Sequence, residues 1–289
     1  MPLDTWATVL RRLDPQEIFR VVIAGYGEAT THPRFSGFVD AMRGHPVRFD
    51  MVSNGHLLDP AKIAQLDGVI DLSIVSFSSI EPAVYRRGHA NLDQQHVMEN
   101  IKSAQAMFKR TRLGISLTPM PECLTPMPAC LPSLPDTLAW LKAQGIAALT
   151  MSPTLYNRGG SLTEHEQASA ELRQLIKRHK LRSQEFDFVP SGREIFSQWR
   201  RNRFKCVPRN VDLFVSSSRD YLYCYNDVGH RHAIGHVKTS GIREMLQRRE
   251  GMAAIPALCG DCNMRDRYGA GELARAGINF VRSKWQRAA

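Results

Sequence analysis

The chain has 289 residues, of which 43% are hydrophobic and 23% charged, an ordinary globular composition that allows a substantial core. No stretch approaches the roughly 20 uninterrupted apolar residues that a membrane-spanning helix requires. Residues 1–17 carry charges where a signal peptide needs its apolar segment. We therefore expect a soluble cytoplasmic protein.

The formal net charge is +10, an excess that attracts nucleic acid, acidic peptides or anionic cofactors. Much of it lies in three local groups of basic residues: Arg200, Arg201, Arg203 and Lys205; Arg243, Arg248 and Arg249; Lys177, Arg178 and Lys180. Such groups form solvated helix faces more often than nucleic-acid sites. Nucleic acid is therefore an unfavoured partner.

Residues 1–160 alternate short apolar runs with amphipathic stretches, a pattern typical of β/α units. The predicted strands read as buried on both faces: Arg20–Gly25, Phe49–Ser53, Leu72–Phe77, Leu113–Thr118 and Ala148–Ser152. The predicted helices are Thr5–Leu13, Phe35–Gly44, Pro60–Leu66, His96–Phe108 and Asp136–Gln144. Five parallel strands with intervening helices form either an open doubly wound sheet or a complete or partial barrel.

The pattern changes near Arg200. Before it come a loop over residues 119–135 with six prolines and a predicted helix over residues 163–180. After it we expect a short hairpin and an amphipathic helix: Asp212–Val215, Tyr221–Tyr223 and Gly241–Arg249. The sequence thus predicts two domains, a main α/β domain over residues 1–199 and a small C-terminal α+β domain over residues 200–289.

Glycine and polar residues follow the ends of successive predicted strands. Gly25-Tyr26-Gly27-Glu28 follows the first, Ser53-Asn54-Gly55 the second, Ser76 ends the third, and Arg158 lies beyond the fifth. Barrels of parallel strands place their active sites at these ends. Glycines allow a ligand to approach the backbone closely, and a carboxylate can hold an amine. A Gly-Tyr-Gly turn alone is more often only a turn, but the order of the turns adds weight.

Because its strand-end turns follow one another in this order, the segment 19–160 resembles the core of the radical S-adenosylmethionine superfamily, a partial barrel of six β/α units. The resemblance implies that Gly25, Gly27 and Glu28 form the turn that binds the amino group of S-adenosylmethionine. It also implies that Asn54 and Ser76 line the cofactor pocket, and that Arg158 meets the methionine carboxylate.

Four of the six cysteines lie in the last third of the chain: Cys206, Cys224, Cys259 and Cys262. In a cytoplasmic chain they argue for a metal site or catalysis rather than disulfides. Their chemistry alone leaves zinc and an iron–sulfur cluster equally open. The other two, Cys123 and Cys130, fall in the proline-rich loop, where incidental thiols are favoured over reactive ones.

The layout around these four cysteines resembles the twitch, or shortened SPASM, extension of radical S-adenosylmethionine maturases. It runs from a cysteine through a hairpin ending at Cys224, a turn at residues 234–237 and a helix to a Cys-x-x-Cys pair. The resemblance implies an auxiliary [4Fe–4S] cluster on the four thiolates. Two departures are Arg219, which stands where a glycine is expected, and the lack of further cysteines after Cys262.

The superfamily's Cys-x-x-x-Cys-x-x-Cys loop is missing, because no cysteine precedes Cys123. We expect a partial (β/α)6 TIM-like barrel that lacks its first strand, and a chain unable to cleave S-adenosylmethionine. A truncated gene product, a misassigned start codon or a relative that works without this cluster would each account for the pattern. The strand at Arg20–Gly25 would expose an edge for a partner protein.

The resemblance implies a radical S-adenosylmethionine-type enzyme that modifies a peptide or a small molecule, with a peptide as the first expectation. The alternative is a non-catalytic scaffold of the same fold that binds a peptide or protein partner. A zinc-bearing nucleic-acid binder would use the positive charge, but no aromatic and basic strand motif supports it.

Overall fold

The computed structural model describes residues 1–18, 20–25, 27–89, 92–117, 133–151, 174, 177–183, 212–227 and 229–259. The chain divides into two compact units. The larger unit holds the described residues from Val9 to Met151 and from 174 to 182, and the smaller unit holds Met1–Thr8, Ser183 and those from 212 to 259. Within the described ranges, no helix combines the length and the apolar character that a membrane crossing needs.

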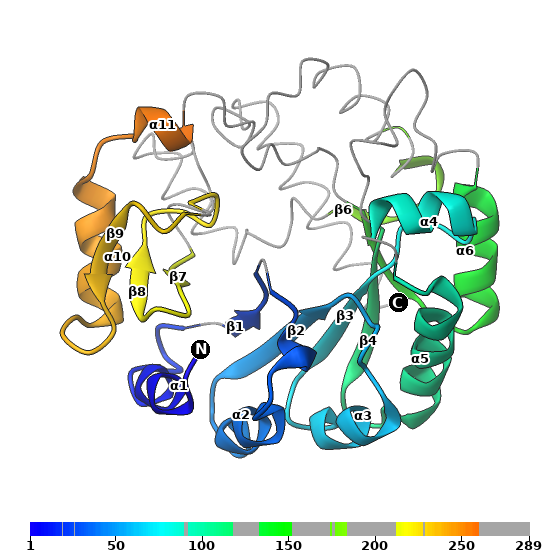
Figure 1. The fold of residues 1–289 in the computed structure, drawn as a ribbon, viewed down its shortest axis with the longest axis horizontal. Helices are drawn as coiled ribbons and strands as arrows, with labels where there is room; N and C mark the ends of the chain where they lie inside the picture. Colours follow the sequence, from blue (N-terminus) through cyan, green and yellow to red (C-terminus); the bar gives the residue numbers. More distant parts are fainter. Residues whose placement is uncertain are drawn as a thin grey trace. The chain divides into compact units, whose positions relative to one another are not determined.

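A six-stranded sheet forms the centre of the larger unit (Figure 1), and its strands follow one another in chain order. They are β1 (Arg20–Ile23), β2 (Arg48–Ser53), β3 (Leu72–Ser76), β4 (Arg112–Leu117), β5 (Ala148–Met151) and β6 (Arg182–Ser183). The four pairs from β1 to β5 are parallel. A doubly wound sheet reverses its strand order at a switch point, whereas the described strands keep one direction, as in a barrel.

Helices cover the outer face of this sheet (Figure 1). They are α2 (Phe35–Met42), α3 (Pro60–Leu66), α5 (Gln94–Met107) and α6 (Leu134–Ala143). Aspartate N-caps mark where α3 and α5 begin. Asp59 accepts the Lys62 amide at 2.9 Å, and Asp93 accepts the Gln95 amide at 2.9 Å. Because Asp93 is the cap, α5 begins two residues before its predicted start. Gly145, at φ +74°, follows the end of α6 as a left-handed C-cap residue should.

The chain that follows β3 is held by two helices. Ser79 Oγ lies 2.6 Å from Ser133 Oγ, and the Ile80 amide donates to Thr137 Oγ1 at 2.9 Å. Gln94 of α5 donates to the Ser79 carbonyl at 2.7 Å. A short helix that the sequence did not separate, α4 (Pro82–Gly88), then leads toward α5. These contacts fix the position of the strand end at Ser76.

A stack of aromatic rings lies beside this loop. His89 packs face to face on Tyr85, with ring centroids 4.2 Å apart, and Tyr85 lies 5.2 Å from Phe77. The His89 Nε2 atom is 3.0 Å from Ser78 Oγ. Because His89 is only 8% exposed, burial disfavours its charged form and lowers its pKa to about 4.

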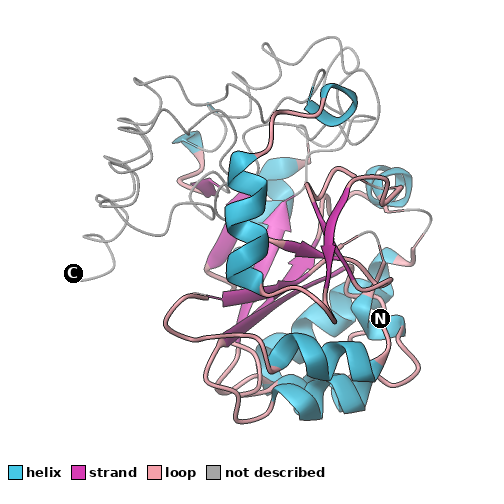
Figure 2. Cartoon of the chain, turned by 90° about the vertical axis from the view of Figure 1, so that its left-hand side faces the viewer, coloured by secondary structure: helices cyan, strands magenta, loops and turns pink. Residues whose placement is uncertain are grey.

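The smaller unit contains an antiparallel three-stranded sheet: β7 (Phe214–Val215), β8 (Asp220–Leu222) and β9 (Ala233–His236). The predicted hairpin is confirmed in β7 and β8. The sequence interpretation of residues 234–237 as a turn is wrong, because β9 completes the sheet there. Helix α10 (Ile242–Gly251) packs on β9 (Figure 2), and the short α11 (Pro256–Cys259) follows it. This unit also holds most of α1 (Leu3–Leu10), which ends three residues before its predicted end.

Arg219, which stands where a glycine is expected, has a left-handed backbone with φ +81°. This conformation costs a non-glycine residue about 1–2 kcal/mol. Its amide donates to the Ser216 carbonyl at 3.2 Å, and its carbonyl accepts the Val237 amide at 2.8 Å. Its guanidinium pairs with Asp4 of α1 at 3.0 Å. The sequence departure thus marks a real glycine-type position that local contacts hold in place.

The buried His89 predicts a pH dependence of stability. In the unfolded chain His89 becomes protonated as the pH falls below its ordinary pKa of 6.5. In the folded chain it stays neutral until the pH falls to about 4. The free energy of unfolding should therefore fall by about 3 kcal/mol as the pH drops from 6.5 to about 4. Above pH 6.5 the ionisation of His89 should not change it. Urea unfolding at several pH values should show this loss in the parent and a smaller one in His89→Gln. His96→Gln, at an exposed histidine, serves as control, and an equal loss in parent and His89→Gln would contradict the assignment.

Candidate functional site

The backbone after β1 is open on the side where the glycines lie. Gly25 and Gly27 are both exposed, and a Cβ atom added to either would meet nothing within 4 Å. Neither has a φ in the left-handed range. Packing inside the protein therefore does not require glycine at these positions. Open space in front of a bare backbone is what a closely approaching ligand needs.

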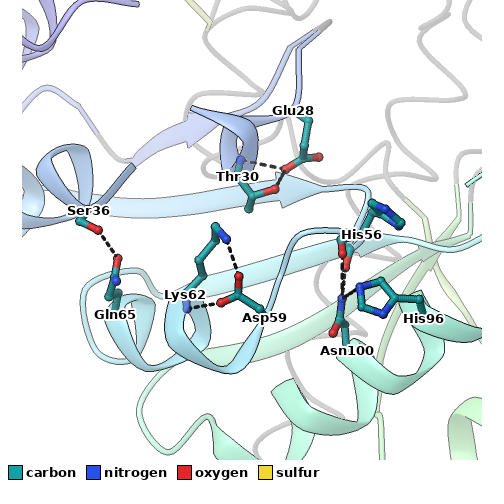
Figure 3. A network of polar contacts seen from close by, with 10 residues as sticks. Glu28, Thr30, Ser36, His56, Asp59, Lys62, Gln65, His96 and Asn100 are labelled. Carbon is teal, nitrogen blue, oxygen red and sulfur yellow. Dashed lines mark hydrogen bonds and ion pairs between the residues drawn. The ribbon is translucent and has the colours of Figure 1, made fainter. Parts of the chain in front are cut away.

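Glu28 is the centre of a hydrogen-bond network that joins the end of β1 to the end of β2. Its Oε1 atom accepts the Thr30 amide at 3.1 Å and the Thr30 hydroxyl at 2.7 Å (Figure 3). The same oxygen accepts the Ser53 hydroxyl at 3.0 Å, and Oε2 accepts the Asn54 amide at 2.7 Å. Four donors thus hold one carboxylate at a fixed place between two strand ends.

The turn after β2 needs its glycine for steric reasons. Gly55 has φ +77°, and a Cβ atom there would lie 2.8 Å from Val75 Cγ1 and 3.1 Å from Val97 Cγ1. Two local bonds complete the turn, from the Gly55 amide to Ser53 Oγ and from the His56 amide to Asn54 Oδ1, each at 3.0 Å. The Ser-Asn-Gly sequence is therefore fitted to a sharp turn against the core.

The Glu28 carboxylate keeps capacity for one more partner. A carboxylate oxygen has two lone pairs, so three donors saturate Oε1, while Oε2 has a single donor among the residues that the structure describes. The side chain is half-buried, so desolvation strengthens whatever it binds. Glu28 can therefore accept a hydrogen bond from a cationic or neutral amine that approaches from the glycine side.

The structure brings some of the predicted cofactor residues together. Glu28 and Asn54 are in direct contact through the Asn54 amide, with Gly25 and Gly27 just before Glu28 in the chain. Ser76 ends β3, the strand next to β2, and is half-buried. Arg158 lies outside the described residues. The role of each as a cofactor ligand stays a prediction.

Sequence reasoning missed Thr30 and Asn100. Thr30 follows Glu28 by two residues, a spacing at which a carboxylate can accept a backbone amide and begin a helical turn; here that turn is the 3₁₀ segment Ala29–Thr31. Asn100 on α5 bonds the carbonyl of Gly55 across 45 residues. No local pattern could have indicated this second contact.

Two of the four predicted metal ligands are described. Cys224, after β8, and Cys259, the last residue of α11, are both partly buried. The Cys224 sulfur accepts the Asn226 amide at 3.4 Å. Cys206 and Cys262 lie outside the described residues, as do Cys123 and Cys130. Among the described residues no group of three or more metal-binding side chains occurs, so the cluster stays a prediction.

Comparison with solved structures identifies the fold. SuiB of Streptococcus suis, solved with S-adenosylmethionine bound, matches with a TM-score of 0.61 at 13% identity, over 90% of this chain and 60% of SuiB. The protein anSMEcpe, also solved with this cofactor bound, matches with a TM-score of 0.59 at 12% identity, over 99% of this chain and 88% of that one. No family model matches the chain, and no curated protein matches it by sequence.

The chain shares the fold of these two proteins, each solved with S-adenosylmethionine bound. This confirms the predicted α/β partial barrel with a parallel sheet. The chain spans only 60% of the length of SuiB. At 11–13% identity the likeness of the chain to these structures is a likeness of fold.

Proposed function

We propose that this chain is a radical S-adenosylmethionine-type enzyme, and that residues 1–289 do not by themselves form the cluster that cleaves the cofactor. The observation that carries the proposal is the Glu28 carboxylate, held by four donors beside an open glycine backbone. It occurs in a fold shared with two proteins that bind S-adenosylmethionine.

In this proposal the chain's residues bind and orient the methionine end of the cofactor. Glu28 Oε2 accepts a hydrogen bond from the ammonium group, and Arg158 pairs with the carboxylate. Asn54 and Ser76 line the pocket between two strand ends. In a complete enzyme, one electron from a reduced [4Fe–4S] cluster would cleave bound S-adenosylmethionine into methionine and a 5′-deoxyadenosyl radical, which would remove a hydrogen atom from the substrate. The chain's part is to position this group and to keep the site apart from water.

The four cysteines of the C-terminal domain, residues 200–289, would hold the auxiliary [4Fe–4S] cluster: Cys206, Cys224, Cys259 and Cys262. Of these four residues, Cys224 has its sulfur held by the Asn226 amide at 3.4 Å. Zinc uses the same ligand set, so the identity of the metal is itself a subject of experiment.

A peptide is the proposed substrate class. SuiB has been solved with its precursor peptide SuiA, and anSMEcpe with the Cp18Cys peptide. The alternative function is a non-catalytic scaffold that binds a peptide or protein through the same partial barrel. The scaffold function would need only the fold that the chain shares with these two proteins.

The chain should bind S-adenosylmethionine weakly and should not cleave it. Charge-assisted hydrogen bonds from Glu28 and Arg158 contribute about 1.5–3 kcal/mol each, which leaves a Kd no better than roughly millimolar after association costs. Saturation-transfer NMR should show binding that Glu28→Gln weakens and that Glu99→Gln, at an exposed glutamate of α5, preserves. Mass spectrometry of reduced protein should find no 5′-deoxyadenosine. Turnover that survives replacement of all four C-terminal cysteines would contradict the mechanism.

Anaerobic reconstitution with iron and sulfide should load one [4Fe–4S] cluster per chain. Four suitably spaced cysteines lie after residue 200, and none lies among residues 1–122. Iron and sulfide analysis with Mössbauer spectroscopy measures the content. Replacing Cys259 and Cys262 together by alanine should remove the cluster, whereas replacing Cys123 and Cys130 should leave it. A content of about eight irons per chain, or colour that persists in the first double variant, would refute this.

The edge strand β1 is the proposed docking place for a partner protein. Among the described strands it pairs only with β2, and Val22 on it is 43% exposed. A free strand edge readily pairs with another chain. Light scattering should detect an assembly that Val22→Lys disperses. Met107→Lys, at an exposed apolar residue of α5, should leave it intact, and a monomer at every concentration with no captured partner would overturn the proposal.

A further inference from the structure

Asn100 holds the turn after β2 from the side of helix α5. Its side chain is buried, with 6% of the residue exposed. The Nδ2 atom donates to the Gly55 carbonyl at 2.9 Å and to the His56 carbonyl at 3.0 Å. An amide nitrogen carries two protons, which these two bonds use, and His96 Nε2 on the same helix lies farther away, at 3.4 Å. Figure 3 shows Asn100 next to His56, on the far side of the turn from Glu28.

The amide groups of the same turn serve the site. The Asn54 amide donates to Glu28 Oε2, and the Gly55 amide donates to Ser53 Oγ. The turn is therefore held by its carbonyl groups on one side and presents its amide groups on the other. A shift of the turn on the α5 side would carry the Asn54 amide away from the carboxylate.

Ser53 and Thr30 fix the direction of the carboxylate. Ser53 is 2% exposed and accepts the Gly55 amide, and its single hydroxyl proton goes to Glu28 Oε1 because an ionised carboxylate can only accept. Thr30, 3% exposed, gives the same oxygen both its amide and its hydroxyl proton. With Oε1 saturated, only Oε2 can accept a further hydrogen bond.

We infer that Thr30, Ser53 and Asn100 are positioning residues that aim Glu28 Oε2 at the amino group of an amino-acid-type ligand. The inference rests on the proposed function only for the identity of that ligand. The network leaves a single open acceptor and no donor from these side chains. It should therefore distinguish a ligand with an amine from one in which this part of the molecule is missing.

The test combines Asn100→Asp and Glu28→Gln in a double-mutant cycle, with S-adenosylmethionine and 5′-methylthioadenosine as probes. The second probe lacks the amino-acid part. Asn100→Asp should weaken binding of the first probe about fivefold, the effect of roughly one hydrogen bond, and leave the second unchanged. In the Glu28→Gln background it should have no further effect. Gln105→Glu makes the same chemical change on the same helix, where the amide bonds the Gly145 carbonyl, and should change neither affinity.

A measurement without ligand separates this inference from the proposed function. The Asn54 amide should show a downfield proton shift and slow hydrogen exchange, both reduced in Glu28→Gln and in Asn100→Asp. Ser53→Ala should reduce them, and Ser53→Thr, which keeps the hydroxyl, should restore them. If Asn100→Asp does not fold, Thr30→Val and the Ser53 pair provide the same comparison.

Each outcome decides one question. Equal weakening of both probes, or additive effects of the two substitutions, would show that Asn100 is only structural. An Asn54 amide that is insensitive to Glu28→Gln would overturn the network itself, whatever binds. A sensitive amide in a chain that binds neither probe would support the positioning roles and refute the proposed cofactor.

Discussion

The site depends on one interaction, the acceptance of four hydrogen bonds by the Glu28 carboxylate. A half-buried charge is costly unless donors replace its lost water, and here two come from Thr30, one from Ser53 and one from the Asn54 backbone. Bonds to an ionised acceptor are stronger than neutral ones. The carboxylate therefore locks the segment after β1 to the turn after β2, and the geometry of the open glycine backbone follows from that lock.

The hydrophobic core constrains the turn after β2 through a glycine, Gly55. The turn after β2 lies so close to Val75 of β3 and Val97 of α5 that Gly55 has no room for a Cβ atom. Val75 and Val97 are fully buried, and buried side chains in a close-packed interior yield little. The core thus sets how closely the turn approaches β3 and α5, and Asn100 fixes its orientation by bonding two of its carbonyl groups. The Asn54 amide lies within reach of Glu28 as a result. A polar site and an apolar core share one short segment of chain.

The sequence predicted what local patterns encode and missed what distant residues decide. The apolar runs of β1 to β5 and the amphipathic stretches of α2, α3 and α6 were identified within two residues of their observed bounds, because burial imposes the periodicity directly. Strand β9 was taken for a turn, since Ala233 and Gly235 are weak strand formers and only pairing with β8 makes the segment extended. Of the Glu28 network, the sequence order indicated Glu28 and Asn54, but the contact of Asn100 with Gly55 depends on the tertiary fold.

The smaller unit holds its hairpin by an independent constraint. A left-handed arginine persists only where the surroundings over-determine its conformation, and Arg219 has three such contacts: with Ser216, Val237 and Asp4. The ion pair adds little, since Asp4 is 63% exposed, so the two backbone bonds carry most of the constraint. They fix the turn that leads into β8, and β8 leads directly to Cys224. The position of this thiol is therefore set by the protein's own hydrogen bonds. If a metal bound there, ordering this ligand would cost less chain entropy than ordering a mobile thiol.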